Sequence, residues 1–405
     1  MFDYFKKKIR ANKQRKKLLL SKTFFDFNTI DFSNKNVLLI DEIVPEYNKD
    51  SGSRRLTTII KLLLENKVTV FLMADYKQHK YKSDYLNYFK ELGVIVYEPA
   101  LDKSNKLITK NVFLKNIMPH MSATWLHRPR VFSKYFKTIK ALNSKTEIIF
   151  DMCDFHYLRL KREWEQKGDV ALKIEAEKNL KQEIEICKKA DKIIAITHED
   201  LNAILPFYNV PEKFEVVSNI HQYVEKPSNF PTFELRNDLL FVGNFRHSPN
   251  EDALLYLHDK IMPLIWAKHP EVNVQIVGSY PTDKVKALHS ERFIVHGFVD
   301  SIVDFFYNSK VFIAPLRYGA GIKGKIGQSL EYSLPVVTTK VGAEGFDFGP
   351  FKNQLIAETP EDLASKLIEL YTNKNLWQEV SAYSETILQP FSTQVTEKNI
   401  LRAIN

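Results

Sequence analysis

Glycines and basic residues gather in one short segment of the chain, Ala314 to Gln328. Three of its glycines, Gly319, Gly321 and Gly324, surround the cations Arg317, Lys323 and Lys325. Glycine exposes backbone N–H donors, and arginine and lysine add positive charge, which together are the groups that a diphosphate requires. The order Gly-x-x-x-x-Gly-Lys-Ser/Thr of a Walker A loop is absent. The segment therefore predicts diphosphate binding, with a charged solvent loop as the alternative.

A second segment, Phe241 to Asn250, leaves an apolar run and enters a helix-like stretch. Gly243 permits a tight turn and a close approach to a ligand. Arg246 and His247 add cationic donors, and the free N–H groups of a helix start attract phosphate. A well-capped junction between strand and helix is the alternative interpretation.

The first half of the chain has three polar segments of this kind. Asp50–Arg55 offers Gly52 for close backbone approach and Arg54 for an anionic group. His127–Arg130 follows an apolar run at Thr124–Leu126. Asp151–His156 follows another run and precedes Arg159 and Arg162. Asp154 and His156 are candidates to bind sugar hydroxyls or to share a proton, although a lone histidine is more often structural.

These segments must be positioned by the elements before them. Short β-branched runs alternate with amphipathic stretches, which predicts a parallel, right-handed doubly wound sheet covered on both faces. The first series of runs is Val37–Ile40, Val68–Met73, Val94–Tyr97, Ile148–Phe150, Ile193–Ile196 and Phe214–Val217. The second is Leu239–Val242, Val272–Val277, Phe293–Val295, Val311–Ile313, Pro335–Thr339 and Gln354–Ala357. Ligands of such sheets bind beyond the carboxyl ends of the strands, where the polar segments lie.

Two series imply two domains that face each other across a cleft. We expect a basic leader at residues 1–30, a first Rossmann-like domain at 31–225, a linker at 226–238 and a second Rossmann-like domain at 239–375. Pro227 and Pro231 mark the linker. Residues 376–405 are expected to form a helical tail that crosses back to the first domain.

Composition narrows the class of protein. The chain has 405 residues and a net charge of +9, with 44% hydrophobic and 26% charged residues, a soluble globular balance. No apolar run is long enough to span a bilayer. Two distant cysteines, Cys153 and Cys187, argue against a disulfide framework or a zinc site and favour a reducing cytoplasm. No nucleic-acid-binding signature is present, so nucleic acid is not an expected partner.

The positive charge is concentrated at residues 1–22, which hold nine lysines and arginines against one acidic residue, Asp3. Apolar Phe2, Tyr4, Phe5 and Ile9 lie among them. A helix of this kind can lie on an anionic membrane surface, each cation adding about 1 kcal/mol. A solvated leader is the equal alternative. The protein is thus expected in the cytoplasm, either free or peripheral at the inner face of the membrane.

Three motifs stand together in the second half. They are Phe-Val-Gly-Asn-Phe-x-His-x-Pro-Asn from Phe241, Pro-Leu-x-x-Gly-Ala-Gly-Ile-Lys-Gly-Lys-Ile from Pro315, and Leu-Pro-Val-Val-Thr-Thr-x-x-Gly-Ala-Glu-Gly from Leu334. With Asp50–Arg54 and Asp151–Arg159, they resemble glycosyltransferase family 4, the group 1 retaining transferases of the GT-B fold, and its O-antigen and capsule subgroup. The resemblance extends from about Val37 to Phe346.

The resemblance implies a retaining, metal-independent transferase in lipopolysaccharide or capsule biosynthesis. It uses a nucleotide sugar, UDP- or GDP-linked, as co-substrate without a cofactor, and a glycan or lipid-linked acceptor. The implied donor-binding residues are Gly243, Asn244, Arg246, Asn250, Arg317, Gly321, Ile322, Lys323, Lys325, Gln328 and Glu331. The implied acceptor-binding residues are Gly52, Ser53, Arg54, Arg128 and Arg159. Catalytic candidates are His127, Asp154, His156 and Lys323.

The sequence departs from the family at several positions: the usual Arg and Lys after the first glycine fall near Asn244 and Asn250, and Ser333 replaces a glycine. Where many members carry Glu-x7-Glu, this chain has Ala320 and Gln328. We expect the Gly-Ile-Lys-Gly-Lys loop and Glu331 to compensate. The alternatives are a catalytically weak GT-B scaffold that only binds, and a sugar-nucleotide epimerase on the same two-domain fold.

Overall fold

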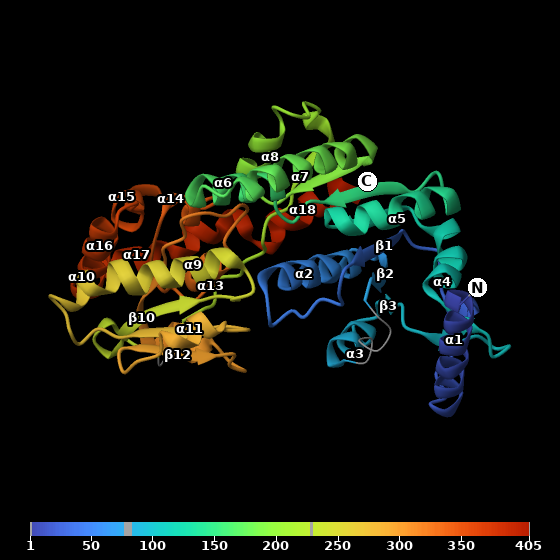
Figure 1. Cartoon of the computed structure of the whole chain (residues 1–405), viewed down its shortest axis with the longest axis horizontal. Coiled ribbons are helices and arrows are strands. Elements are labelled where there is room, and N and C mark those ends of the chain that lie inside the picture. Colours follow the sequence, from blue (N-terminus) through green and yellow to red (C-terminus); the bar gives the residue numbers. More distant parts are fainter. Residues whose placement is uncertain (1, 77–82, 227–229, 405) are drawn as a thin grey trace.

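The computed structural model describes residues 2–76, 83–226 and 230–404, with side chains from residue 9 onward. Two parallel sheets, of seven and five strands, form two α/β domains side by side (Figure 1). Each sheet has its own core of buried aliphatic and aromatic residues. The predicted α/β architecture is therefore confirmed.

The first sheet has the order β3-β2-β1-β6-β7-β8-β9, and all its pairings are parallel. Its strands are β1 Asn36–Asp41, β2 Thr69–Ala74, β3 Ile95–Val96, β6 Ala123–His127, β7 Glu147–Asp151, β8 Lys192–Ala195 and β9 Phe214–Val216. Every residue of β1 is buried, as expected for a central strand covered on both faces. Asp41, His127 and Asp151 end their strands at the same edge of the sheet.

Helices cover both faces of this sheet. They are α2 Ser51–Glu65, α3 Asp84–Glu91, α4 Lys110–Ile117, α5 Pro129–Leu142, α6 His156–Lys167, α7 Val170–Lys189 and α8 His198–Ile204, and a hairpin of β4 Ala100–Leu101 and β5 Leu107–Ile108 lies at one side. Helix α2 shows why these segments fold locally. Asp50 caps it by accepting a hydrogen bond from the Ser53 N–H at 2.8 Å, and its apolar stripe, with Leu56 and Leu63, is buried.

The second sheet has the parallel order β12-β11-β10-β13-β14. Its strands are β10 Asn237–Val242, β11 Val274–Val277, β12 Phe293–Gly297, β13 Ser309–Ala314 and β14 Val336–Thr338. Its helices are α9 Ser248–Tyr256, continued by a π-helical turn at Leu257–Ile261 into α10 Met262–Trp266, and then α11 Asp283–Ala287, α12 Val303–Asn308, α13 Gly324–Glu331, α14 Lys340–Ala343, α15 Lys352–Leu355, α16 Pro360–Thr372 and α17 Lys374–Leu388.

One predicted strand is wrong. Gln354–Ala357 reads as a short apolar run, but Gln354 and Leu355 end helix α15, and only Ile356 forms a single bridge to Thr338 beside β14. The Lys366 ammonium donates to the carbonyls of Asn353 and Ile356, which satisfies the helix end. The short apolar run therefore ends a helix, and a lysine of α16 binds carbonyls at that end.

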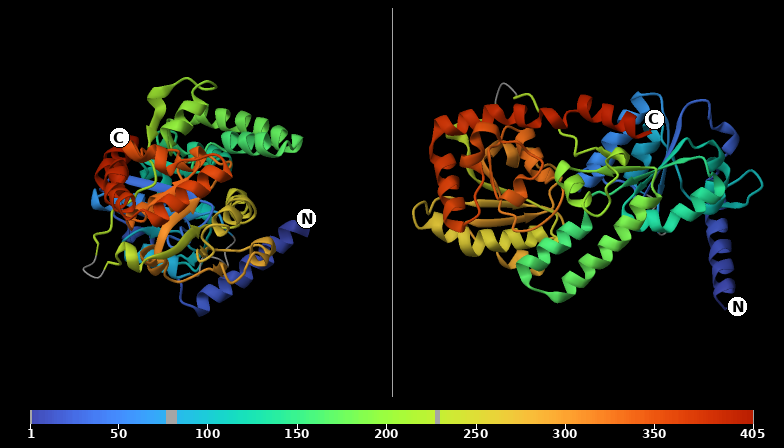
Figure 2. Two further views of the ribbon diagram at one scale, coloured as in Figure 1. Left: turned by 90° about the vertical axis from the view of Figure 1, so that its left-hand side faces the viewer. Right: turned by 90° about the horizontal axis from the view of Figure 1, so that it is seen from above.

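The C-terminal helix α18, Thr393–Ile404, packs against the first domain although α17 belongs to the second (Figure 2). Its Ile400, Ala403 and Ile404 are part of the first core. Asn66 of that domain donates to Glu397 at 2.6 Å. The chain thus passes between the domains twice, once after β9 and once before α18.

The N-terminal helix α1, Phe2–Leu20, stands away from the rest of the first domain (Figure 1). The residues after it return to that domain, where Phe25 and Phe27 pack against the core. Within the described ranges, no helix combines the length and apolarity needed to cross a bilayer.

Candidate functional site

A cleft of about 870 Å³ separates the two domains at the carboxyl ends of their strands. Fifteen of the predicted site residues line it: Gly52, Arg54, His127, Arg128, Asp154, His156, Arg159, Gly243, Asn244, Arg246, Asn250, Ile322, Lys323, Lys325 and Gln328. Most residues that were predicted at separate strand ends therefore meet in one cleft. Ser53, Arg317, Gly321 and Glu331 lie outside the lining.

Two lysines give the second domain a buried positive charge at the cleft. Burial lowers the pKa of Lys323, whose ammonium donates to the Gly321 carbonyl and lies 3.4 Å from Glu344 Oε2. Burial, with the nearby Lys323 charge, also lowers the pKa of Lys325 to about 7, and its ammonium donates to Asn250 Oδ1. An anionic ligand between them would favour the charged form of both lysines.

The backbone around these lysines is shaped for close approach. Helix α13 begins at Gly324, and in the described structure no side chain caps its first turn. Its free N–H groups add to the charge of Lys323 and Lys325 at the same wall. On the neighbouring turn, a Cβ at Gly278 would lie 1.7 Å from the Gly243 carbonyl oxygen, so glycine is required there. This wall is suited to a diphosphate.

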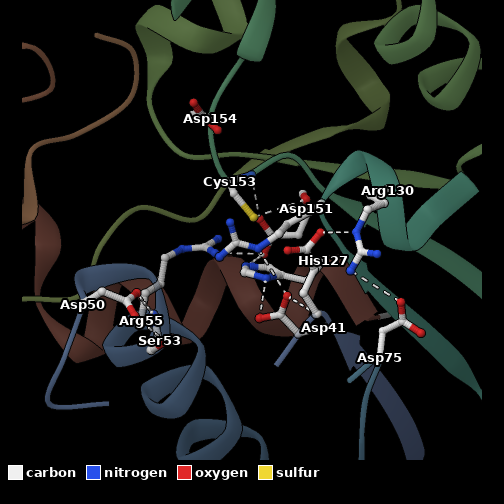
Figure 3. A network of polar contacts seen from close by, with 12 residues as sticks. Asp41, Asp50, Ser53, Arg55, Asp75, His127, Arg130, Asp151, Cys153 and Asp154 are labelled. Atoms are coloured by element: carbon white, nitrogen blue, oxygen red, sulfur yellow. Dashed lines mark hydrogen bonds and ion pairs between the residues drawn. The ribbon is translucent and has the colours of Figure 1, made fainter. Parts of the chain in front are cut away.

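In the first domain, His127 lies between two aspartates at the strand ends (Figure 3). Its Nδ1 is 3.0 Å from Asp41 Oδ2 and its Nε2 is 4.0 Å from Asp151 Oδ2. Although burial opposes the charge, Asp41 raises the pKa of His127 to about 10, and the pair lowers that of Asp41 to about 2. His127 is therefore a fixed imidazolium at neutral pH, able to donate but not to accept a proton.

Asp151 belongs to the same network and links it to Arg55 and Trp125. It accepts from Arg55 Nη1 and from Trp125 Nε1, both at 2.9 Å, and Arg55 Nη2 donates to the Val217 carbonyl. His127, Asp151 and Cys153 bring their ligand atoms within 4.8 Å of one another, the spacing of a metal site. Because the Arg55 guanidinium already neutralises Asp151 and His127 is charged, this group does not suit a cation.

Asp154, His156 and Arg159 form a second polar group at the cleft. His156 Nδ1 lies 3.1 Å from Glu183 Oε1, and its Nε2 lies 3.4 Å from Asp154 Oδ1. Asp154 Oδ2 accepts from Arg159 Nε at 2.9 Å. Burial opposes the positive charge, but the two carboxylates raise the pKa of His156 overall. The group can therefore donate from His156 and accept at Asp154, which suits sugar hydroxyls.

The structure does not place Arg317, predicted to bind the diphosphate, in the cleft lining. Its guanidinium forms an ion pair with Asp252 of α9 and lies 5.0 Å from the ring centre of Tyr256. Both partners belong to α9, and none of the three residues lines the cleft. Arg317 was expected at the site because it is close to the glycines in the sequence. Its guanidinium pairs instead with the Asp252 carboxylate of α9.

Glu331 and Ser53 are also corrected. Glu331 is only 2% exposed and accepts from both nitrogens of Arg54, at 2.8 and 2.9 Å, while His221 Nδ1 lies 2.7 Å away. It is therefore not free for ribose or sugar hydroxyls, and the Arg54 charge is already neutralised. Ser53 donates its hydroxyl to Asp50 at 2.9 Å and belongs to the cap of α2.

Sequence reasoning missed Asp200, which lies beside the predicted donor-binding residue Gly321. With a φ of +67°, Gly321 packs against the first domain: a Cβ there would lie 3.6 Å from Asp200 Oδ2 and 3.7 Å from Asp154 Cβ. Asp200 is buried, and burial together with Asp154 raises its pKa to about 6. Its position just after strand β8 is the signal that would have found it.

The sequence analysis also missed other residues at or near the cleft. Asp41 ends β1, and the segment from Phe298 to Val303 follows β12 and lines the cleft. Arg162 and Glu344 form an ion pair of 2.5 Å between the domains. The strand-end rule points to Asp41 and to the 298–303 segment, whereas the Arg162 contact required the relative placement of the domains.

The comparisons with known proteins agree with this geometry. Residues 236–373, nearly the whole second domain, match the family model of glycosyl transferases group 1. An uncharacterized 44.6 kDa protein in the cps region of Klebsiella pneumoniae is 24% identical over 179 residues, 42% of this chain. That match covers 46% of the relative, so the chain spans about half the length of the curated relative.

Solved structures show the same fold at low identity. HepE of Anabaena, crystallised with UDP and glucose, is 14% identical with a TM-score of 0.66, over 92% of this chain and 99% of its own. TarM, described for S. aureus, is 14% identical with a TM-score of 0.68, over 93% of this chain and all of its own. The two-domain arrangement is thus the GT-B fold.

Proposed function

We propose that this chain, whose residues 236–373 match the family model of group 1 glycosyltransferases, transfers a sugar from a nucleotide-sugar donor to a glycan or lipid-linked acceptor. The observation that carries the proposal is the placement of Lys323 and Lys325 beside the uncapped start of α13, facing the acceptor-side polar groups across one cleft. The cps-region relative supports a place in surface polysaccharide biosynthesis. The UDP in the HepE crystals favours a UDP-linked donor.

The chemistry follows from charge separation. As the glycosidic bond to the diphosphate breaks, negative charge grows on the phosphate oxygens and positive charge on the anomeric carbon. Lys323, Lys325 and the α13 N–H groups are fixed where the negative charge develops, and one such donor contributes about 3–4 kcal/mol to lowering the barrier. These cations would take the part that a metal ion takes in other transferases.

We assign retention of configuration to the leaving phosphate, which accepts the acceptor hydroxyl proton on the face from which it departs. No protein nucleophile is then needed. His127 is charged and buried, so we assign it a donor role toward the transferred sugar rather than that of a base. Asp154 and His156 would orient the sugar hydroxyls, and Arg128 and Arg159 the acceptor.

On the donor side, Gly243 and Gly278 both line the cleft and would lie beside the nucleotide diphosphate. Asn244, Asn250 and Gln328, which line the cleft, would offer neutral donors and acceptors to ribose or sugar hydroxyls, and Arg246 would bind a phosphate. Ile322 would contact the sugar through its backbone. Gln328 keeps hydrogen-bonding ability at the position where family members carry a carboxylate.

Helix α1 supports a peripheral contact with an anionic membrane, where a lipid-linked acceptor would lie. From residue 9 onward, Arg10, Lys13, Arg15 and Lys16 are all exposed, and so are Ile9 and Leu20. Each cation near an anionic surface adds about 1 kcal/mol. Flotation with vesicles of phosphatidylglycerol and phosphatidylcholine tests this: removal of residues 1–20 should abolish binding, and unchanged binding would exclude α1 as the contact.

The function is tested by incubating the protein with UDP-, GDP-, CMP- and dTDP-linked sugars, with and without lipid-linked glycan acceptors, and following the products by NMR. Transfer with an α- or β-anomeric product identical to the donor configuration supports a retaining transferase. Nucleotide binding without turnover would support the scaffold alternative, which the Gln328 position favours. Conversion of the donor sugar without an acceptor would support an epimerase instead.

A further inference from the structure

Helix α6 belongs to the first domain but reaches the second (Figure 2). Its Arg162 Nη1 donates to the Gly319 carbonyl at 2.7 Å and to Glu344 Oε2 at 2.9 Å, and its Nη2 lies 2.5 Å from Glu344 Oε1. Gly319 lies within the predicted diphosphate-binding segment 314–328, and Glu344 follows the next strand, β14. A first-domain residue thus contacts the second-domain site at two points.

Glu344 is shared by two cations. Its Oε2 is 2.9 Å from Arg162 Nη1 and 3.4 Å from Lys323 Nζ. The Glu344 side chain is only 14% exposed and that of Lys323 only 9%, so their attraction is little screened by solvent. Without Arg162, Glu344 would have Lys323 as its sole cationic partner among the contacts described, in competition with any ligand phosphate.

The loop that carries Lys323 contains two glycines in the left-handed region of backbone conformation. Gly319 and Gly321 have φ values of +151° and +67°, a region that side chains other than hydrogen rarely permit. Arg162 fixes the carbonyl of Gly319, and Asp200 and Asp154 pack against Gly321. The conformation that presents Lys323 to the cleft therefore depends on groups from the opposite domain.

We propose that Arg162 is a positioning residue for the diphosphate site: it neutralises Glu344 and fixes Gly319, so that Lys323 is free to bind the diphosphate only while the two domains are closed on each other. This inference rests on the proposed donor site. The Arg162–Glu344 ion pair then links domain closure to phosphate binding. A variant without Arg162 should fold normally but bind the donor more weakly.

Arg162 could also act as a purely structural contact between the domains. The two roles differ in whether nucleotide affinity depends on the charge of Glu344. If Arg162 acts by neutralising Glu344, then removing the carboxylate should restore what removing the guanidinium destroys. A purely structural contact predicts no recovery of nucleotide affinity, because each substitution breaks the same contact and the double variant does not restore it. Double-mutant cycles separate these cases.

The experiment measures UDP and GDP binding to the full chain by calorimetry in four variants: Arg162→Gln, Glu344→Gln, the double variant, and Lys161→Gln as control. Lys161 is the neighbour of Arg162 on α6 and pairs only loosely with Glu165, at 3.8 Å. Arg162→Gln should raise the Kd about tenfold, within the usual range for coupled sites. Adding Glu344→Gln should lower it again by at least about threefold, while the control stays at the wild-type value.

Thermal melting of each variant verifies folding. A Kd for Arg162→Gln equal to that of the wild type, or a double variant as weak as Arg162→Gln alone, would overturn the proposal while leaving the donor site standing. If the wild type binds neither UDP, GDP nor any other nucleoside diphosphate, the proposed function fails, and this inference fails with it.

Discussion

The Arg54 guanidinium of the first domain and the Glu331 carboxylate of the second form a doubly hydrogen-bonded ion pair beside the cleft, at 2.8 and 2.9 Å. His221, on the segment that joins the domains, closes the group at 2.7 Å from the same carboxylate. Residues expected to bind two different substrates bind each other instead. The pair therefore holds the domains together on one side of the cleft, as Arg162 and Glu344 do elsewhere.

The Arg54–Glu331 pair should stabilise the closed arrangement by a modest amount. Fully buried pairs lose about 3–5 kcal/mol when one partner is removed. The Arg54 side chain is 38% exposed, so solvent weakens the effect, and we expect about 1–2 kcal/mol. Denaturant unfolding of Arg54→Gln, Glu331→Gln and the double variant measures this coupling. Strictly additive changes in the unfolding free energy would show that the two side chains do not interact in solution.

Arg317 should be dispensable for donor binding. Its partner is Asp252, and its side chain is 35% exposed at the edge of α9. Arg317→Gln should leave the Kd for UDP or GDP within about twofold of the wild type and lower stability by at most about 1 kcal/mol, as for a surface pair. Calorimetry measures the Kd of Arg317→Gln and, for comparison, that of Lys323→Met, which should bind the nucleotide more weakly. A tenfold loss in Arg317→Gln would return this residue to the site.

Nucleoside diphosphate binding should be coupled to proton uptake at Lys325. Its pKa is about 7 because burial and Lys323 disfavour its charge. At pH 8 the free protein therefore has mostly neutral Lys325, and a bound diphosphate would recharge it. The Kd should weaken as pH rises from 7 to 9. Calorimetry in buffers of different ionisation enthalpy should detect uptake approaching one proton, and Lys325→Met should abolish it.

The same depressed pKa has a consequence for stability. The unfolded chain binds a proton at Lys325 up to pH of about 10.4, and the folded chain only up to about 7, so Lys325 destabilises the fold most at low pH. Lys325→Met should therefore raise the Tm more at pH 6 than at pH 10. An equal change at both values would show that Lys325 is charged in the fold throughout.

The Asp41–His127 pair should make stability fall in alkaline solution. The folded pKa of His127 is raised to about 10 from an ordinary 6.5, so its contribution is complete below pH 6.5 and disappears as pH rises to 10. The size is on the order of a few kcal/mol. Unfolding free energies from pH 6 to 10 should decline in the wild type and decline less in His127→Gln. Parallel profiles would contradict the buried imidazolium.

Much of the fold follows from the sequence because strands buried on both faces leave a clear signal. The runs at Val37–Ile40 and Val311–Ile313 lie inside the strands β1 and β13. The failure at Gln354–Ala357 shows the limit: a short apolar run fits the end of a helix as well as a strand, and here Lys366 donates to the Ile356 carbonyl. Short segments at a sheet edge are set by tertiary partners, which spacing does not reveal.

The site was predictable to the extent that it depends on strand ends. His127, Asp154 and Lys323 follow separate strands, and the topology of parallel sheets brings those ends together. What spacing did not reveal is which charges are already paired. Arg317 and Glu331 each have a partner from a distant part of the chain, at Asp252 and Arg54. Such pairing depends on how helices and domains pack, and no local pattern encodes it.

The central claim is that Lys323 holds the diphosphate of a nucleotide in the cleft between the domains. It is tested most directly by the ratio of the Kd for a nucleoside to that for its diphosphate, for example uridine against UDP, in the wild type and in Lys323→Met. The account predicts a wild-type preference for the diphosphate of at least about a hundredfold, the worth of one or two charge-assisted hydrogen bonds, falling about tenfold or more in the variant. An equal ratio in the two proteins would contradict it.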